Sequence, residues 1–360
     1  MIPVVSFRLL PLTQRLAWVT TSTTKFERAH LGAFLPTAVT GLKTTMFSTR
    51  GANATTDPMD PPPLPSDPTS RVVKAALCQV SVSDDKAANI RRAGSLIAEA
   101  ASRGAKLVVL PEIWNSPYSN DAFPKYAEEI DPTLVDSTTS TLGAPSFEFM
   151  SRAAKDHGVV LIGGSIPTRK DDKLYNTCFV FDKMGELIGS YSKLHLFDIE
   201  IPNKITFRES DTLTGGEGLS VIDTDVGRIG LGICYDIRFP ELAALYSARG
   251  VQIMVYPGAF NMTTGPLHWE LLQRARAVDN QMFVLTCSPA RDEQAGYVAW
   301  GHSTAVGPFA EVLGTTDEKE SIVYADLDLG EVETRRMNMP LSRQRRADLY
   351  AVVDMTRPGS

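Results

Sequence analysis

Cysteine and histidine are scarce in this chain of 360 residues, which has four Cys and five His. Four cysteines are too few for a disulfide scaffold. The histidines form no HxH or HExxH cluster and no CxxC pair occurs, so we expect no metal site. An uncharged apolar run of about 18 residues is also missing, so we expect no segment that spans a membrane.

Positive charge is in short supply, because 36 Lys and Arg stand against 42 Asp and Glu, a net charge of -6. This balance argues against a general polyanion binder, and we expect no nucleic-acid partner. The charge is also uneven along the chain. Residues 1–50 hold six basic residues, one acid and thirteen Ser or Thr, whereas residues 51–70 hold six prolines, three Asp and no cation.

The composition of residues 1–50, which is rich in Arg and hydroxyl groups and poor in acids, is typical of an organellar transit peptide. The alternative is a disordered N-terminus that carries no targeting signal. Residues 51–70 are predicted to form an extended linker, because proline fixes backbone torsion and removes donors. We therefore predict a chloroplast or mitochondrial protein, with a cytoplasmic form if translation starts at Met46 or later, and one folded domain over 71–360.

Residues 71–360 alternate short apolar strands with helical patterns. A strand is predicted over 72–80, a helix capped by Asp84 or Asp85 follows, and one further strand is predicted over 159–166. A hairpin is predicted around the turn at 183–185. Because hairpins interrupt the alternation, the pattern favours an α/β fold with a mixed sheet and helices on its outer face.

The predicted helix over 266–280 carries apolar residues at helical spacing. Leu267, Leu271, Ala275 and Val278 recur at three- and four-residue intervals. This stripe is predicted to face the core.

One of the four cysteines stands in a special context. Cys78, Cys178 and Cys287 lie within apolar strands and are predicted to be buried core residues. Cys234 instead ends a strand, shortly before a helix that begins with Pro240. Such an elbow can expose a nucleophile beside free backbone N–H groups. The alternative is a buried structural cysteine.

Two further charged residues follow predicted strands. Glu112 and Lys193 each stand at the carboxyl end of a strand, where ligands of α/β proteins gather. A cysteine nucleophile needs a nearby base or cation, and these residues could supply both. Their spacing alone does not show that they meet, so solvated strand-end charges remain the alternative.

Three segments, LPEIWNSPYSN (110–120), SKLHLFDIEIPNKITFRES (192–210) and GRIGLGICYDIRFPE (227–241), resemble the signature blocks of the nitrilase superfamily of carbon–nitrogen hydrolases. The resemblance implies an αββα sandwich and a catalytic Glu112, Lys193 and Cys234, with a second glutamate at Glu209. It also implies that no cofactor is needed. Homodimers or larger homo-oligomers are implied as well, with an oligomerisation arm at about 335–360.

Within the superfamily, residues 204–210, 256–281, 287–292 and 297–303 resemble the ω-amidase branch. This implies a small-molecule amide substrate, namely the monoamide of a 2-oxo dicarboxylic acid such as 2-oxoglutaramate or 2-oxosuccinamate. The alternatives are a deaminated-glutathione amidase, another amidase of the superfamily, or a catalytically idle scaffold. Asn203 stands where the branch has Gly, and Asn tolerates the same left-handed backbone.

The implied mechanism is amide hydrolysis through a Cys thioester. Glu112 takes the thiol proton of Cys234, while Lys193 and the N–H of Tyr235 stabilise the oxyanion. Glu209 orients Lys193 or polarises the substrate.

Four more residues are predicted to contact the substrate. Arg238 is expected to bind the far carboxylate, with a structural ion pair as the alternative. Tyr118 is expected to donate its hydroxyl, with wall packing as the alternative. Phe260 and Asn261 are expected to line the pocket.

Overall fold

The computed structural model describes residues 71–130, 143–203 and 205–356. The described residues fall within one unit, Ala54–Ser360. The predicted leader (1–50) and linker (51–70) lie outside them. In this part of the chain, no helix is both long and apolar enough to cross a membrane.

A first sheet of eight strands runs in the order β16-β1-β2-β4-β6-β5-β3, with β7 paired to β6. Parallel pairs (β1–β2 and β2–β4) and antiparallel pairs (β1–β16 and β6–β7) both occur, so the sheet is mixed as predicted. Its strands are β1 (Val72–Gln79), β2 (Leu107–Val109), β3 (Glu128–Glu129), β4 (Val160–Ile162), β5 (Ile166–Lys170), β6 (Lys173–Phe181), β7 (Leu187–Ser192) and β16 (Ser321–Asp328).

A second sheet of six strands runs in chain order from β10 to β15. A separate two-stranded hairpin, β8–β9, precedes it in the chain. The strands are β8 (Asp198–Ile201), β9 (Ile205–Arg208), β10 (Val221–Thr224), β11 (Gly227–Leu231), β12 (Ile253–Pro257), β13 (Phe283–Cys287), β14 (Thr304–Val306) and β15 (Val312–Thr315).

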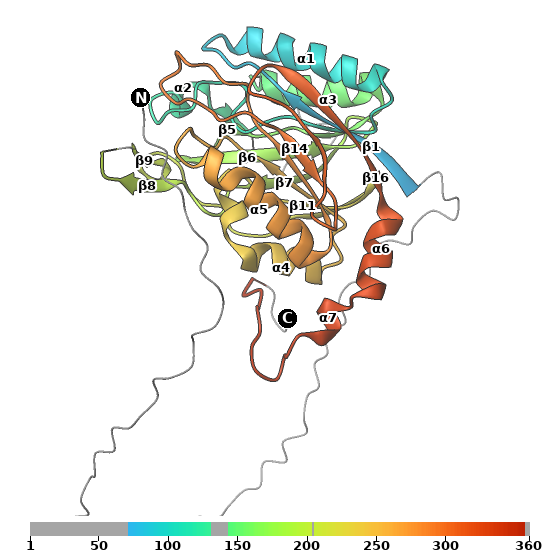
Figure 1. The fold of residues 1–360 in the computed structure, drawn as a ribbon. Helices are drawn as coiled ribbons and strands as arrows, with labels where there is room; N and C mark the ends of the chain where they lie inside the picture. Colours follow the sequence, from blue (N-terminus) through green and yellow to red (C-terminus); the bar gives the residue numbers. More distant parts are fainter. Residues whose placement is uncertain (1–70, 131–142, 204, 357–360) are drawn as a thin grey trace, which may run out of the picture. The chain divides into compact units, whose positions relative to one another are not determined.

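Helices cover the outer face of each sheet, α1 and α3 on the first and α4 and α5 on the second (Figure 1). The αββα sandwich predicted from the sequence is therefore confirmed. The helices are α1 (Lys86–Ser102), α2 (Phe123–Tyr126), α3 (Pro145–His157), α4 (Pro240–Ala248), α5 (Gly265–Asn280), α6 (Leu329–Asn338) and α7 (Leu341–Gln344), with short 3-10 turns η2 (Glu209–Asp211) and η3 (Cys234–Arg238).

The core follows the alternation of side chains along each strand. In β2, Val109 packs between the sheets in one cluster with Leu231 and Leu285, whereas Val108 belongs to the cluster that includes Ile97 of α1. Both faces of the first sheet are thus buried, which explains why its strands read as continuous apolar runs.

Several local predictions are confirmed. Asp85 caps α1, since its side chain accepts a hydrogen bond from the backbone N–H of Ala88 at 2.9 Å. β6 and β7 form the predicted hairpin. Asn203 has a φ of 61°, which is the left-handed conformation expected at this position.

The single strand predicted over 159–166 is wrong, because the chain forms β4 and β5 with a break between them. Gly164 in the break has a φ of +62°, and a Cβ there would collide with the backbone carbonyl of Pro111. The apolar run gives no sign of this turn, which is needed because the backbone at Gly164 passes close to that of Pro111.

The predicted core stripe of α5 is also wrong. Leu267 and Leu271 are 67% and 63% exposed, whereas Trp269 and Ala277 are buried together with Arg276. A polar residue lies on the inner face because the guanidinium of Arg276 donates to the carbonyl of Ile237 at 2.8 Å. The helix is present as predicted, but its buried face is a different one, and that face carries a polar group that holds η3.

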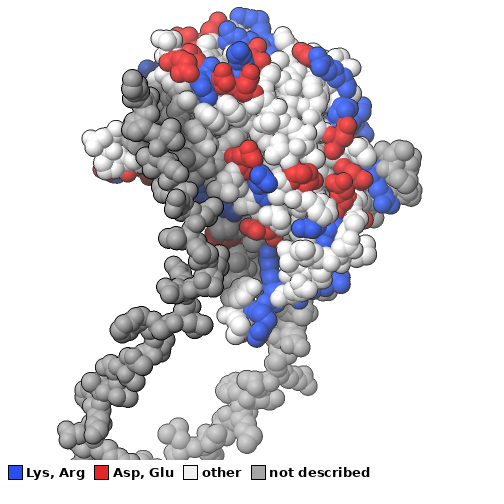
Figure 2. Space-filling view, in the orientation of Figure 1, with Lys and Arg blue, Asp and Glu red and all other residues white. Residues whose placement is uncertain are grey.

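On the face shown in Figure 2, basic and acidic side chains are interspersed. The pair Arg103–Glu99 at 2.8 Å, at the end of α1, is one such contact between exposed groups. Exposed pairs of this kind contribute little to stability.

Candidate active site

The structure brings Glu112, Lys193 and Cys234 together, although they lie far apart in the sequence. The ammonium Nζ of Lys193 donates to Oε1 of Glu112 at 2.9 Å. The thiol of Cys234 lies near both groups, since its pKa, raised first by burial, is raised further by Glu112 and lowered by Lys193. Glu112 and Lys193 are fully buried, so the alternative of solvated strand-end charges is wrong.

Cys234 sits at the predicted elbow between β11 and α4. Its φ of 47° is rare for a non-glycine residue, and such strain persists only where the surroundings enforce it. Cys234 opens the short turn η3 and is only 5% exposed. Gly258 lets the chain approach closely, since a Cβ there would lie 3.3 Å from Cα of Cys234.

The carboxylate of Glu112 is held at both oxygens. Oε1 accepts from Nδ2 of Asn176 at 2.9 Å as well as from Lys193, and Oε2 accepts from the backbone N–H of Ala259 at 2.9 Å. Burial raises the pKa of Glu112, while the Lys193 cation opposes this shift. Ile113, the next residue, has a φ of 50°, so strain flanks this group too.

Glu209 is a second buried carboxylate on the same cation. Its Oε1 lies 3.0 Å from Nζ of Lys193, and its Oε2 accepts from the backbone N–H of Phe197 at 2.6 Å. Burial lowers the pKa of Lys193, but the two carboxylates outweigh it and raise the pKa well above its usual range. Lys193 is therefore a permanent cation between two acids.

The thiol is protonated in the resting site. Burial first, and then the Glu112 carboxylate, raise the pKa of Cys234 well above its usual range, with Lys193 opposing them. A buried thiol of this kind needs a base to become a nucleophile. Glu112, whose charge acts directly on the thiol, is the base that we assign to it.

Tyr118 is placed differently from its predicted role. Its hydroxyl donates to Oε1 of Glu209 at 2.5 Å and lies 3.3 Å from Oε1 of Glu112. Its ring stacks on Tyr297 with centroids 4.5 Å apart. The tyrosine therefore supports the carboxylates and also forms part of the wall, which was the alternative for this residue.

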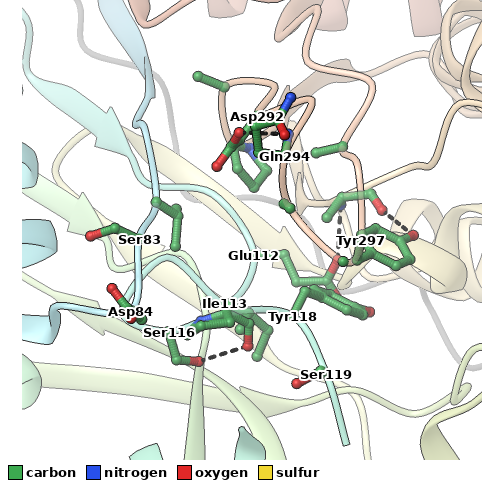
Figure 3. A pocket seen from close by; sticks show the side chains of 18 residues that line it. Ser83, Asp84, Glu112, Ile113, Ser116, Tyr118, Ser119, Asp292, Gln294 and Tyr297 are labelled. Carbon is green, nitrogen blue, oxygen red and sulfur yellow. Dashed lines mark hydrogen bonds between the residues drawn. The ribbon is translucent and has the colours of Figure 1, made fainter.

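A cavity of about 420 Å³ opens beside these tyrosines. Ser83 and Asp84 lie on one side of it and Tyr118 and Tyr297 on the other (Figure 3). Glu112 is the member of the triad that lines it. The cavity therefore adjoins the segment that carries the buried carboxylate.

Arg238 lies close to the nucleophile turn. Its guanidinium sits 4.7 Å from the ring centre of Phe260 and 5.5 Å from that of Tyr235, and Nη1 contacts Nδ1 of His268 at 3.2 Å. Across residues 71–130, 143–203 and 205–356, no ion pair joins it to a carboxylate, and its Nε is buried without a partner. The alternative of a structural ion pair therefore finds no support.

Phe260 and Asn261 follow β12. Phe260 packs edge-on against Trp269, with centroids 5.0 Å apart. Oδ1 of Asn261 accepts from the backbone N–H groups of Thr263 and Thr264 at 3.0 Å each, so this oxygen holds the start of α5. Its Nδ2 is buried and has no partner within the described part of the chain.

Sequence reasoning missed Asn176 and Tyr297. Asn176 binds Glu112 through its side chain, and its carbonyl accepts the N–H of Lys193 at 2.9 Å. Tyr297 donates its hydroxyl to the carbonyl of Ala259 at 2.7 Å. Neither residue has a local signal, since Asn176 lies mid-strand in β6 and Tyr297 in a loop.

The other cysteines are buried core residues, as predicted: Cys78, Cys178 and Cys287 are free and fully buried. A search of the described residues finds no group of three or more His, Cys, Asp or Glu able to hold a metal ion.

Curated relatives resemble most of this chain. An "Omega-amidase, chloroplastic" of Arabidopsis thaliana is 60% identical over 295 residues, which cover 82% of this chain and 78% of the relative. The "Omega-amidase NIT2" of Homo sapiens is 53% identical over 285 residues, covering 79% of this chain and 99% of the relative.

Solved structures share the fold. Saccharomyces cerevisiae Nit3, described as a member of branch 10 of the nitrilase superfamily, matches with a TM-score of 0.69 and 46% identity, covering 76% of this chain and 97% of that one. The family model for carbon-nitrogen hydrolases matches residues 74–337. The chain therefore belongs to the carbon–nitrogen hydrolase family of the nitrilase superfamily and is a hydrolase of carbon–nitrogen bonds.

Proposed function

We propose that this protein is an ω-amidase that hydrolyses the terminal amide of 2-oxo dicarboxylic acid monoamides, such as 2-oxoglutaramate and 2-oxosuccinamate. The observation that carries the proposal is a cysteine at a strained elbow beside a buried, hydrogen-bonded pair of Glu112 and Lys193. The relatives named omega-amidase, at 60% and 53% identity, support the substrate class. An idle scaffold would have no need to keep these buried charges, which are costly to desolvate.

In the first step, Glu112 accepts the thiol proton of Cys234 and the thiolate attacks the amide carbon. Negative charge then develops on the carbonyl oxygen. Nζ of Lys193 and the N–H of Tyr235 are the donors that we assign to it, and one such donor is commonly worth about 3 kcal/mol in the transition state. Glu209 keeps the ammonium of Lys193 charged and fixed for this task.

In the second step, Glu112 gives its proton to the departing nitrogen, which leaves as ammonia, and a thioester forms on Cys234. Glu112, now a carboxylate again, takes a proton from water, and the resulting hydroxide attacks the thioester. The products are the dicarboxylate and the regenerated thiol. Asn176 and the N–H of Ala259 hold both oxygens of Glu112 during these proton transfers.

We assign the far carboxylate of the substrate to Arg238. The cation lies four residues after Cys234 and carries a buried Nε without a partner in the described chain. A guanidinium binds a carboxylate through two parallel N–H groups. Phe260 and the unpartnered Nδ2 of Asn261 complete the region that we assign to substrate binding.

We also propose that copies of this chain associate as a dimer or a larger homo-oligomer. Large apolar side chains are exposed on α5 and near the C-terminus, among them Leu267 (67%), Leu271 (63%), Leu349 (69%) and Met355 (89%). A second copy would remove such surface from water.

Finally, we propose that residues 1–50 address the protein to a chloroplast or mitochondrion and that residues 51–70 link this leader to the hydrolase domain at 71–360. The Arg-bearing, acid-poor composition supports this proposal, as does the relative named "Omega-amidase, chloroplastic". Translation from Met46 would leave the protein in the cytoplasm.

The purified protein is expected to release ammonia from 2-oxoglutaramate. Cys234→Ala should lower the rate by about 10⁴-fold or more, because the thioester cannot form.

The rate of the wild-type protein should fall on the acid side as Glu112 becomes protonated. This fall should occur at a pH above that for an exposed glutamate, since burial raises the pKa of Glu112. A coupled ammonia assay measures both effects. Equal activity of the wild-type protein and Cys234→Ala would refute the thioester mechanism. Turnover of deaminated glutathione alone would assign the protein to the deaminated-glutathione amidases.

Arg238→Met is expected to raise KM for 2-oxoglutaramate by about 10- to 100-fold, as for the loss of a charge-assisted hydrogen bond. The rate of hydrolysis of butyramide, which has no carboxylate, should change by less than about threefold. The KM of Arg238→Lys for 2-oxoglutaramate should lie between those of the wild-type protein and Arg238→Met. Steady-state kinetics with both substrates provide the comparison. A similar loss on both amides would mean that Arg238 supports the turn and does not bind the carboxylate.

Light scattering after size-exclusion chromatography is expected to give at least twice the mass of one chain. Replacing Leu267 and Leu271 by Glu should shift the protein toward the monomer, because charges would then lie in the interface. Met184→Glu serves as the matched control, since Met184 is also exposed (58%) but lies in the turn of the β6–β7 hairpin. A monomeric wild-type protein would rule out the proposed assembly.

A fluorescent protein fused behind residues 1–70 should enter chloroplasts or mitochondria in plant cells. A fusion that begins at Met46 should stay in the cytoplasm, because it lacks most of the basic residues of the leader. Microscopy with organelle markers distinguishes the two. Cytoplasmic fluorescence of the longer fusion would contradict the assignment of residues 1–50.

A further inference from the structure

A third buried carboxylate near the site, that of Asp236, lies two residues after Cys234 and is fully enclosed. Its Oδ2 accepts from the backbone N–H of Ile233 and from the hydroxyl of Tyr191, both at 2.8 Å. Its Oδ1 accepts from the backbone N–H of His195 at 2.9 Å and contacts the ring Nδ1 of His195 at 2.7 Å. Asp236 is therefore held by groups from two separate segments.

The positions of these donors suggest a purpose. Tyr191 and His195 lie two residues before and two residues after Lys193. The carboxylate of Asp236 therefore holds residues 191–195, the lysine segment, at both ends. Ile233 directly precedes Cys234, so the same carboxylate closes the turn that carries the nucleophile. One side chain thus joins the two segments that supply Nζ of Lys193 and the N–H of Tyr235.

The ring of His195 is fixed as well. It stacks on Phe239 with centroids 3.6 Å apart and an interplanar angle of 11°. Phe239 closes η3 and caps α4. The lysine segment is therefore clamped between Asp236 and the end of the nucleophile turn.

We propose that Asp236 is a positioning residue that sets the distance between the two oxyanion donors, Lys193 and the N–H of Tyr235. This inference rests on the proposed amidase function, because it concerns the same site. The general base, besides its contact with Lys193, is held by two groups that Asp236 does not touch, Asn176 and the N–H of Ala259. Loss of Asp236 should therefore damage oxyanion stabilisation far more than activation of the thiol.

A carboxylate suits this position better than a neutral amide. Burying a charge is costly unless it is hydrogen-bonded, and here both oxygens are held. Burial, and then the charge of Asp236, raise the pKa of Tyr191, so its hydroxyl stays protonated as a donor. An asparagine of the same shape would place an NH₂ group against two donors and could not accept all four contacts.

The test compares two reactions of Cys234 in the full chain carrying Asp236→Asn. Hydrolysis of 2-oxoglutaramate develops an oxyanion, whereas alkylation by iodoacetamide forms a carbon–sulfur bond, expels iodide and develops none. We expect kcat/KM for the amide to fall by about 10²-fold, the effect of one lost oxyanion donor. The alkylation rate, followed by mass spectrometry of the Cys234 peptide, should change by less than about threefold.

Asp223→Asn is the matched control. Asp223 lies on β10 and pairs with Arg228 of β11, and the side chain of Asp223 is 57% exposed. It should leave both reactions unchanged. Should Asp236→Asn fail to fold, Tyr191→Phe combined with His195→Ala removes two of the four contacts and keeps the carboxylate. That variant should lower amide turnover by about tenfold, again with alkylation unchanged.

Two results would overturn the proposal. Equal losses in hydrolysis and alkylation would show that Asp236 only supports the fold, and an unchanged kcat/KM would show that it has no part in catalysis. Wild-type activity separates this question from the proposed function. A wild-type protein that releases no ammonia from 2-oxoglutaramate would refute the proposed substrate, whereas an active wild-type protein with an unaffected Asp236→Asn variant would refute only the role of Asp236.

Discussion

The site depends on one cation, the ammonium of Lys193, held between two buried carboxylates. Its Nζ lies 2.9 Å from Glu112 and 3.0 Å from Glu209, and all three side chains are fully buried. Any one of these charges alone would be too costly to bury, so they are stable only together. Three loops, after β2, after β7 and after β9, must therefore close on one point.

The nucleophile comes from the other sheet and obeys a different constraint. Cys234 is held in a left-handed conformation by the turn after β11, with α5 and Asp236 supporting that turn from two sides. The αββα sandwich brings the charged cluster, which the first sheet and the β8–β9 hairpin carry, against this turn of the second sheet. Chemistry that needs a base, a cation and a thiol within one site is thus a consequence of how the two sheets pack.

Local signals in the sequence predicted local structure well. The cap at Asp85 and the β6–β7 hairpin are each set by residues within a few positions, and both are confirmed. The left-handed Asn203, which the resemblance to the ω-amidase branch implied, is confirmed as well. The predictions of an unbroken strand over 159–166 and of the core face of α5 were wrong, because contacts with distant backbone decide both. Asn176 and Tyr297 were missed for the same reason, since each is defined by what it touches across the fold.

The sequence by itself determined the chemical groups of the site and the elements that carry them: a cysteine on a strand-to-helix elbow and two charged residues at strand ends. Tertiary structure decided which groups meet, which oxygen of Glu112 faces which donor, and which side of α5 is buried. The physical reason is that hydrogen bonds and desolvation act over a few ångströms in space, whereas the separation of 81 positions between Glu112 and Lys193 carries no such information.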